Sequence, residues 1–378
     1  MGIFKRMIAA GKYRLSEFIQ SKMNVYSTLR NINHIRRGDY VFFLSQPSHA
    51  QNIIQIISEI PRDKFLIVKN YSKSIDDGIS TDINCIRWYG FDLKPLKPKI
   101  LITPHVSFPR KMTLANTKII HLIISLMPLE NVYLEDAFDD PDYIAVATNY
   151  QIQSFLKLAS KRPDKLKGKH LLPIGYPKID SIIKRNYNNP SSFESRKNVV
   201  LLAPTHRYSG NENVALANSE ISSLIAAILR LDYNLIYRPH PVSFNSDSDF
   251  IREIEKRYAQ DAKFTLDDSI DYFETYSHSD VMITDYSGTG LTFAWGFNKR
   301  AIFYTSEQNS VFGEDIYFAQ NTTELEQVLK RIIKNQKQNL LETAENLIFN
   351  LGSSSEVFFN YLCLIKAGKL DSGWISLS

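Results

Sequence analysis

The chain is predicted to be an α/β protein with two doubly wound parallel sheets, and three observations support this. Short apolar segments alternate with helical segments along most of the 378 residues. These segments are apolar throughout rather than at alternate positions, as in parallel strands covered by helices on both faces. The alternation restarts after the polar, proline-broken stretch 187–192, which is typical of a linker between two domains.

Each half of the chain contributes its own set of predicted elements. In the first half we expect strands at 40–44, 65–69, 99–103, 118–124 and 143–147, and helices at 49–60 and 150–160. In the second half we expect strands at 198–203, 234–237, 281–284 and 301–304, and helices at 218–231, 249–259, 290–296 and 323–334. The expected domains are 1–185 and 186–350, followed by 351–378, whose helix could cross back to the first domain. Because such sheets bind ligands beyond the carboxyl ends of their strands, we expect the site in a cleft between two facing Rossmann-like domains.

Composition and charge exclude several classes of protein. Hydrophobic residues make up 44% of the chain and charged residues 22%, which is typical of a soluble globular protein. The net charge of +5 is too small to indicate nucleic-acid binding, but it suits an anionic substrate or membrane surface. Cys85 and Cys363 have no metal-ligand or redox spacing and fit a reducing cytoplasm. There is no apolar run of about 18 residues and no convincing signal peptide, so we expect a cytoplasmic protein.

The first 23 residues combine apolar and basic positions at helical spacing. Apolar residues from Ile3 to Ile19 alternate with basic residues from Lys5 to Arg14. Such a helix either lies on an anionic membrane surface, here the inner face of the cell membrane, or packs on its own domain. Both interpretations remain open.

The segment Asp280–Gly290 is the strongest candidate for a binding site. An apolar strand runs into Asp285-Tyr-Ser-Gly-Thr289 and then into an apolar helix. The first backbone N–H groups of a helix have no intrahelical partner, and the helix dipole adds positive potential there. Ser287, Gly288 and Thr289 would let a phosphate approach these donors closely. Two roles remain open for Asp285, which either orients His240 or caps the helix.

Two further strand ends carry groups suited to phosphate chemistry. Arg238-Pro-His-Pro241 follows one strand, and its prolines stiffen the backbone around His240. A guanidinium and an imidazole together can bind a pyrophosphate and stabilise a leaving phosphate. Ala203-Pro-Thr-His-Arg207 follows another strand, and there Thr205 and Arg207 could contact a phosphate or the far substrate, although Arg207 could equally form only a surface ion pair. These strand ends indicate an enzyme that handles a nucleotide diphosphate.

Three histidines of the first half lie in or after predicted strands. His121 lies inside an apolar strand, where an isolated histidine is more often a core residue than a catalyst. His49 opens a helix directly after the first strand, with Asn52 one turn later, and His105 follows the strand at 99–103. His49, Asn52 and His105 are candidates for the side of the cleft that binds the acceptor. A role in the cleft and a purely structural role are equally open for them.

Metal-dependent and P-loop chemistry are both disfavoured. The sequence contains no GxxxxGK[ST] and no GxGxxG segment. The acidic segment 135–140 has no histidine or cysteine at ligand spacing and is better explained as a solvated loop. We therefore expect no metal and no cofactor.

Taken in chain order, five segments resemble the CDP-glycerol glycerophosphotransferase family, whose members polymerise or prime teichoic acids and related capsules. They correspond to the family's GYPxxD, APTxR, RPHP, ITDYSS and KPxxFY-like segments, at 175–180, 203–207, 238–241, 283–288 and 299–304. The resemblance spans roughly residues 99–305. It implies a fold of GT-B type and transfer of a polyol phosphate from a CDP-activated donor, with release of CMP.

The resemblance also implies roles for particular residues. Arg238, His240, Ser287 and the turn after Ser287 would bind the donor phosphates. The family's proposed base is a histidine in a WHG segment, and the only candidate at that position is His121, although Ile120 and Leu122 replace its tryptophan and glycine. Gly288 stands where the family has a second serine, with Thr289 as a candidate substitute.

On these grounds we expect a transferase of cell-surface polymer biosynthesis (teichoic acid-like, capsule or lipopolysaccharide). The second domain would bind the nucleotide-activated donor, and the first would bind a glycan or lipid-linked hydroxyl acceptor. His121 would remove the acceptor proton, while Arg238, His240 and 287–289 would neutralise charge on the leaving nucleotide. Two alternatives remain open: a glycosyltransferase of the same fold that uses a UDP- or CMP-sugar, and a non-catalytic nucleotide- or glycan-binding protein with a decayed site.

Overall fold

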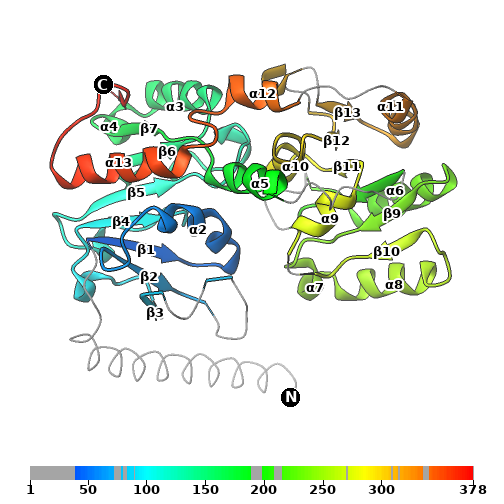
Figure 1. Cartoon of the computed structure of the whole chain (residues 1–378), viewed down its shortest axis with the longest axis horizontal. Coiled ribbons are helices and arrows are strands. Elements are labelled where there is room, and N and C mark those ends of the chain that lie inside the picture. The colour runs from blue at the N-terminus through cyan, green and yellow to red at the C-terminus, as the bar shows by residue number, and fades with distance from the viewer. Residues whose placement is uncertain are drawn as a thin grey trace, which may run out of the picture. The chain divides into compact units, whose positions relative to one another are not determined.

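The structure is a computed structural model, and it describes residues 39–71, 78–79, 83–88, 90–188, 198–207, 215–269, 271–307, 310–313, 316–334 and 340–377. The basic helix expected in the first 23 residues lies outside these ranges. Within them, no helix has the length and apolar character needed to cross a bilayer. The chain folds into two compact units (Figure 1). The first unit runs to Ile124 and also contains Pro128–Lys178 and the chain from Ser353 onward. The second unit contains Ser125–Met127 and Ile179–Gly352.

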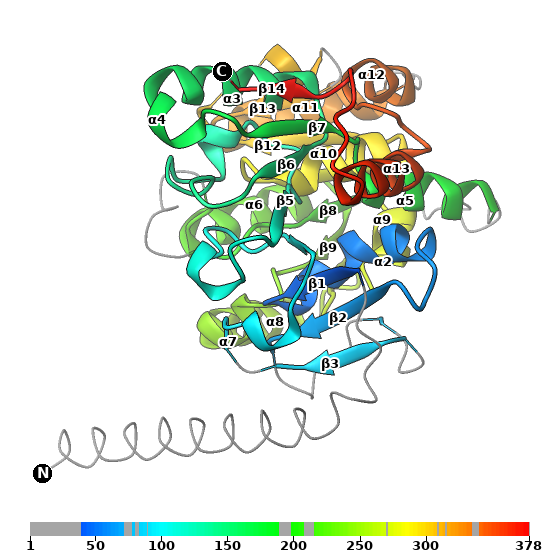
Figure 2. The same cartoon turned by 90° about the vertical axis from the view of Figure 1, so that its left-hand side faces the viewer.

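The described part of the first unit contains one sheet of eight strands in the order β14-β7-β6-β5-β4-β1-β2-β3 (Figure 2). All its pairs are parallel except that of β14 with β7. The strand order reverses between β1 and β4, as in a doubly wound sheet. The strands are β1 (Tyr40–Leu44), β2 (Phe65–Lys69), β3 (Cys85–Arg87), β4 (Ile100–Thr103), β5 (Lys118–Leu122), β6 (Tyr143–Val146), β7 (His170–Pro173) and β14 (Ile375–Ser376).

Both faces of this sheet are buried. Side chains alternate across a strand, so Phe42 and Leu44 of β1 face one apolar cluster and Val41 and Phe43 face another. Helices α2 and α13 cover the first cluster, and the segment around Trp88 covers the second. The helices that complete the unit are η1 (Pro47–His49), α2 (Ala50–Ser58), η2 (Lys94–Leu96), η3 (Arg110–Met112), η4 (Leu129–Asn131), α3 (Asn149–Lys161), α4 (Pro163–Leu166) and α13 (Ser354–Lys366).

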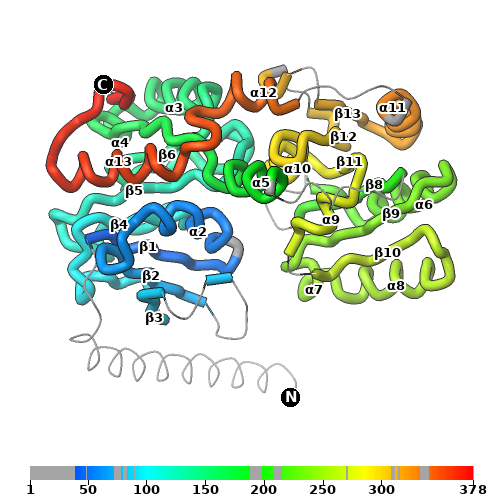
Figure 3. Tube along the Cα trace, viewed as in Figure 1, coloured from blue at the N-terminus to red at the C-terminus, as the bar shows by residue number. Residues whose placement is uncertain are grey.

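Helix α13 returns to the first unit from the far end of the sequence (Figure 3). Phe358, Leu362 and Ile365 recur at helical spacing and are buried in the same cluster as Ile53 of α2. The C-terminal segment is therefore part of the core of the first unit. Helix α5 (Pro177–Asn188) begins where the first unit ends.

The described part of the second unit contains a six-stranded parallel sheet in the order β10-β9-β8-β11-β12-β13. Here the strand order reverses between β8 and β11. Both parallel sheets predicted from the sequence are thus confirmed. The strands are β8 (Val199–Leu202), β9 (Asn234–Tyr237), β10 (Phe264–Leu266), β11 (Val281–Thr284), β12 (Arg300–Tyr304) and β13 (Tyr317–Ala319).

One helix of the second unit packs unusually closely on the sheet. An added Cβ at Gly290 of α10 would lie 2.8 Å from the ring of Phe303 in β12, so only glycine fits this contact. From Gly290 onward α10 is entirely buried, and only its first turn is accessible. The helices of the unit, besides α5, are α6 (Asn218–Arg230), α7 (Ser243–Ser246), α8 (Ser248–Tyr258), α9 (Phe273–His278), α10 (Gly288–Phe297), η6 (Ser310–Phe312), α11 (Thr322–Lys334) and α12 (Leu340–Leu347).

Candidate active site

Three polar segments of the second unit follow adjacent strands at one edge of its sheet. Segment 204–207 follows β8, segment 238–241 follows β9, and segment 285–289 follows β11. Because β8 lies between β9 and β11 and all three strands are parallel, the segments come together at the carboxyl edge. This edge includes the point where strand order reverses, which is where doubly wound sheets bind their ligands.

Asp285 joins two of these segments by hydrogen bonds. Its carboxylate Oδ2 accepts from the Thr205 N–H at 2.9 Å and from the Leu216 N–H at 3.4 Å. Asp285 is fully buried, and desolvation raises its pKa to about 6 despite these hydrogen bonds. These bonds hold the loop after β8, a contact that the sequence did not predict, and the two roles that the sequence left open stay predictions.

The first turn of α10 is the accessible end of an otherwise buried helix. Ser287 precedes the helix in an extended conformation, and its hydroxyl lies 3.2 Å from that of Thr284. Ser287, Gly288 and Thr289 are all partly exposed. A ligand could therefore reach the backbone N–H groups here. Phosphate binding by these three residues stays a prediction.

Gly288 lies against a segment from a distant part of the sequence. An added Cβ at this position would be 3.0 Å from Ser125 Oγ and 3.4 Å from the Leu126 nitrogen. The Ser125 hydroxyl itself accepts a hydrogen bond from the Met127 N–H at 3.2 Å. A serine at position 288, as the family motif has, would require Ser125 to shift.

His240 lies beside His206, with ring centroids 4.6 Å apart and planes tilted by 34°. Burial, and then the neighbouring His206, lower the pKa of His240 to about 4, so the ring is uncharged at neutral pH. Its Nδ1 accepts a hydrogen bond from the Val242 N–H at 3.2 Å. In a neutral imidazole the other nitrogen then carries the proton. His240 therefore presents an Nε2–H donor, which suits a phosphate oxygen.

Arg238 is engaged inside the second unit. Its Nη1 donates to Asp267 Oδ2 at 2.5 Å and to Ser269 Oγ at 2.9 Å, and its Nη2 donates to the Ser269 carbonyl at 2.9 Å. The side chains of Arg238 and Asp267 are each only 10% exposed. The guanidinium thus ties the end of β9 to the loop after β10, and its contact with a donor phosphate stays a prediction.

A hollow lies beside the loops after β8 and β9. Thr205 and Arg207 line it together with the apolar side chains of Ile221, Tyr237 and Phe250. This places both predicted residues of the 203–207 segment at a concave surface. Their contact with a ligand stays a prediction.

Three histidines come together at the corresponding edge of the first sheet. His49 ends η1 after β1, His105 follows β4, and His121 lies in β5. The three strands are adjacent and parallel, and the strand order reverses between β1 and β4. Asn52 is buried on α2, three residues after His49 and therefore on the same helical face. The residues predicted for the acceptor side thus lie at the switch point of the first sheet.

His121 is neutral and keeps one ring nitrogen unpaired within the described part of the chain. Burial is the main cause that lowers its pKa to about 3, and His105 and His49 lower it further. A hydrogen bond with the His105 backbone opposes these effects, which means that the ring donates to that carbonyl. Nε2 has no hydrogen-bond partner among the described residues. The neutral ring therefore keeps its free lone pair on Nε2, as a base requires.

Sequence reasoning missed some residues with clear contacts at these edges. Ser45 directly follows β1, and its hydroxyl lies 2.8 Å from His105 Nδ1. His206 lies in the 203–207 segment and packs on His240. Their positions just after strands were a usable signal. Ser125 carried no such signal, because only the fold brings it to Gly288.

Within the part of the chain that the structure describes, no group of three or more His, Cys, Asp or Glu side chains could hold a metal ion. The acidic segment 135–140 contributes instead to an ion pair. The Asp139 carboxylate binds the Arg162 guanidinium through hydrogen bonds of 2.7 Å and 2.9 Å. This segment therefore has a structural role.

The two doubly wound units, each with polar groups at the switch point of its sheet, have the architecture of the GT-B class. Residues 130–344 match the model of the CDP-Glycerol:Poly(glycerophosphate) glycerophosphotransferase family. Because the match covers more than half of the chain, the protein belongs to this family and is a transferase of cell-surface polymer biosynthesis. A comparison with curated proteins finds no match.

Solved structures of several proteins share the fold at low sequence identity. A variant of the wall teichoic acid polymerase TagF soaked with CDPG has a TM-score of 0.58 and 14% identity over 93% of this chain and 99% of its own. The UDP-GlcNAc 2-epimerase of Methanocaldococcus jannaschii, with UDP-GlcNAc and UDP, has a TM-score of 0.60 and 15% identity over 86% of this chain and 99% of its own. MnaA of S. aureus with UDP has a TM-score of 0.59 and 15% identity over 86% of this chain and 96% of its own. These likenesses show the fold alone and confirm the predicted GT-B architecture.

Proposed function

We propose that the protein transfers glycerol phosphate, or a similar polyol phosphate, from a CDP-activated donor to a hydroxyl acceptor and releases CMP. The observation that carries this proposal is the meeting of the His240 Nε2–H and the accessible start of α10 at one sheet edge. A ring N–H donor and a helix N-terminus both favour an anionic diphosphate. Membership of the glycerophosphotransferase family supports a CDP-linked polyol as the donor that contains this diphosphate.

In the proposed donor complex, the diphosphate lies at the first turn of α10 and accepts the His240 hydrogen bond. Thr205 and Pro239, from the loops after β8 and β9, line the small hollow beside this edge. Arg207, which is exposed beside this hollow, supplies positive charge near the phosphates. Asp285 holds the Thr205 loop in position from beneath.

In the proposed reaction, His121 Nε2 takes the proton of the acceptor hydroxyl. The acceptor oxygen forms a new bond to the phosphorus that carries the polyol, and the bond from that phosphorus to the bridging oxygen of CMP breaks. CMP leaves with the electron pair, and the His240 N–H and the α10 start stabilise its charge. A pKa of about 3 makes His121 a weak base in the free protein. Negative charge brought close to the ring by a substrate would raise that pKa and strengthen the base.

A nucleotide sugar is the second candidate donor. Gly288 departs from the family motif at the proposed phosphate site, so the donor group need not be the family's own. A sugar donor would need the same diphosphate contacts, and the structure of the second unit suits both.

A donor screen tests the proposal. The full chain is incubated with CDP-glycerol, CDP-ribitol, CMP-sugars and UDP-sugars, with and without EDTA, and the released nucleotide is identified. We expect CMP release from a CDP-polyol that persists in EDTA. Release of UDP from a UDP-sugar would establish the glycosyltransferase instead, and no turnover of any donor would favour a binding protein.

The place of action that we propose is the inner face of the cell membrane, with a glycan or lipid-linked acceptor. The basic, amphipathic composition of residues 1–23 supports it. Co-sedimentation with anionic liposomes that is unchanged when these residues are deleted would refute their part in it.

A further inference from the structure

The first turn of α10 contacts a segment from the first half of the sequence. Ser125–Met127 belong to the second unit, whereas the chain on both sides of them belongs to the first. A Cβ at Gly288 would lie 3.0 Å from Ser125 Oγ and 3.4 Å from the Leu126 nitrogen. The φ angle of Gly288 is outside the left-handed region, so its backbone conformation does not require glycine. The missing side chain therefore serves to make room for Ser125.

The Ser125 hydroxyl is held at this position by its own segment. Its Oγ accepts a hydrogen bond from the Met127 N–H at 3.2 Å. Leu126 and Met127 are 0% and 1% exposed, so the segment is anchored in the core. Ser125 itself is partly exposed, as are Gly288 and Thr289. Because a hydroxyl that accepts a hydrogen bond can also rotate and donate its own proton, Ser125 can bind a ligand at the start of α10.

Ser287, the first serine of the motif at this turn, already uses both of its donors. Its backbone N–H donates to the Asp285 carbonyl at 2.8 Å. Its hydroxyl forms a hydrogen bond with the buried Asp285 carboxylate and lies 3.2 Å from the hydroxyl of Thr284. Because an ionised carboxylate can only accept, the single hydroxyl proton of Ser287 points to Asp285. Ser287 therefore has no donor left for a phosphate.

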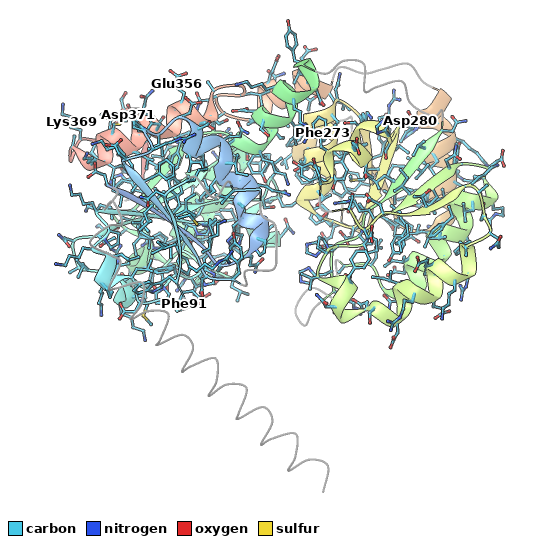
Figure 4. All side chains as sticks on the ribbon, turned by 60° about the horizontal axis from the view of Figure 1, so that its bottom comes forward. Phe91, Phe273, Asp280, Glu356, Lys369 and Asp371 are labelled. Atoms are coloured by element: carbon cyan, nitrogen blue, oxygen red, sulfur yellow. The ribbon has the colours of Figure 1, made fainter. Side chains whose placement is uncertain are left out.

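The start of α10 is nevertheless open to a ligand. Ser287 occupies the N-cap position, where a serine side chain normally accepts from one of the first N–H groups. Here its side chain caps none of them. These groups have no intrahelical partner, and the helix dipole makes the position attractive to anions. Asp280, labelled in Figure 4, directly precedes β11, and the open helix start follows the opposite, carboxyl end of that strand.

We propose that the Ser125 hydroxyl, rather than that of Ser287, binds the diphosphate of the donor. In the complex, a phosphate oxygen accepts hydrogen bonds from the Ser125 O–H and from the N–H groups at the start of α10. Ser125 Oγ keeps its bond from the Met127 N–H, which holds the hydroxyl beside the helix start. The inference rests on the proposed function in placing the diphosphate at this helix start.

Positions 125 and 288 thus exchange one hydroxyl group. The family motif has a serine at position 288, and the Cβ of that serine would lie 3.0 Å from Ser125 Oγ. The two side chains would compete for the same space. In this chain Gly288 leaves that space to Ser125, and the hydroxyl comes from a different segment.

Binding of CDP and of UDP to the full chain tests the inference, because both nucleotides carry the diphosphate. Isothermal titration calorimetry gives their Kd values. We expect Ser125→Ala to raise Kd by about 10- to 100-fold, as for the loss of one hydrogen bond to a charged group. Ser287→Ala should weaken binding less than Ser125→Ala does. An unchanged Kd in Ser125→Ala would overturn the proposal.

Matched variants control for indirect effects. Ser223→Ala removes an exposed hydroxyl of α6 in the same unit and should leave Kd unchanged. Ser125→Gly combined with Gly288→Ser moves the hydroxyl to the other segment and should recover at least about tenfold in Kd over Ser125→Gly alone. No recovery would contradict the exchange. If Ser125→Ala fails to fold, Ser125→Cys, with a thiol of similar shape that donates only weakly, replaces it in the test.

The outcomes separate this inference from the proposed function. Binding of CDP that does not depend on Ser125 would defeat the inference alone. Binding of UDP but not CDP, weakened by Ser125→Ala, would support the inference and defeat the CDP-linked donor. No binding of either nucleotide would defeat both.

Discussion

His240 Nδ1 accepts a hydrogen bond from the Val242 N–H, so the other ring nitrogen, Nε2, carries the proton and can donate to a ligand. We predict that His240→Ala lowers kcat/KM by about two to four orders of magnitude, because a developing negative charge loses its partner. His240→Gln places an amide N–H near the position of Nε2, while His240→Asn reproduces only the Nδ1 side. The glutamine variant should therefore retain more activity in a CMP-release assay at matched thermal stability. Equal rates for the two, or a near-normal alanine variant, would remove His240 from the site.

Gly288 and Ser125 should be energetically coupled. Because a Cβ at position 288 would lie 3.0 Å from Ser125 Oγ, Gly288→Ser should lower the free energy of unfolding by about 1–3 kcal/mol. Removing the serine hydroxyl in Ser125→Gly should make room and recover part of that loss in the double variant. Urea unfolding of the unchanged chain, the two single variants and the double variant gives the coupling free energy between the two positions, expected at about 0.5–3 kcal/mol. Strictly additive effects would contradict the contact.

Arg238 shows what residue-level prediction from sequence leaves out. Its motif indicates a phosphate ligand, but its guanidinium is bound to Asp267 and Ser269 in the loop after β10. Nothing in the local sequence connects these positions. By contrast, the predictions for His240 and His121 use only information that is local in the chain, namely a strand-end position for His240 and a family motif for both.

At the scale of elements, Asp285 ties the turn after β11 to the loop after β8. Burial raises the pKa of its carboxyl to about 6, above its ordinary value of 3.8. Between these pH values the folded state binds more protons than the unfolded state, so stability falls as pH rises through this range. Asp285→Asn keeps an acceptor and loses the charge. Its free energy of unfolding should therefore equal or exceed that of the unchanged chain at pH 7, and the advantage should shrink toward pH 5.

Asp285→Ala is the matched contrast. It leaves the Thr205 N–H without its acceptor and should cost about 1–3 kcal/mol. Urea unfolding at pH 5, 6 and 7 measures both variants. An asparagine variant that is less stable at pH 7, with a pH-independent difference, would contradict the raised pKa.

The strands that the sequence predicted well are short runs buried on both faces. The predicted strands 40–44 and 281–284 coincide with β1 and β11, whose residues are all buried. The missed strands β3, β7, β10, β13 and β14 are two to four residues long and include partly exposed positions. Their extended form depends on pairing with a neighbouring strand, which intrinsic preference does not encode.

At the scale of the whole molecule, the sequence predicted which strands end in polar segments but not which of these segments meet. The strand order decides that. In the second sheet β8 lies between β9 and β11, and this brings three distant segments to one edge. In the first sheet the adjacency of β1, β4 and β5 gathers His49, His105 and His121 in the same way. Strand order arises from long-range packing, so local patterns could not supply it.

A structure of the full chain with bound CDP is the most direct test of the donor site. The diphosphate should accept hydrogen bonds from the first turn of α10 and from His240 Nε2. A nucleotide bound away from the carboxyl edge of β8, β9 and β11, or that edge left empty at saturating CDP, would contradict the proposed function.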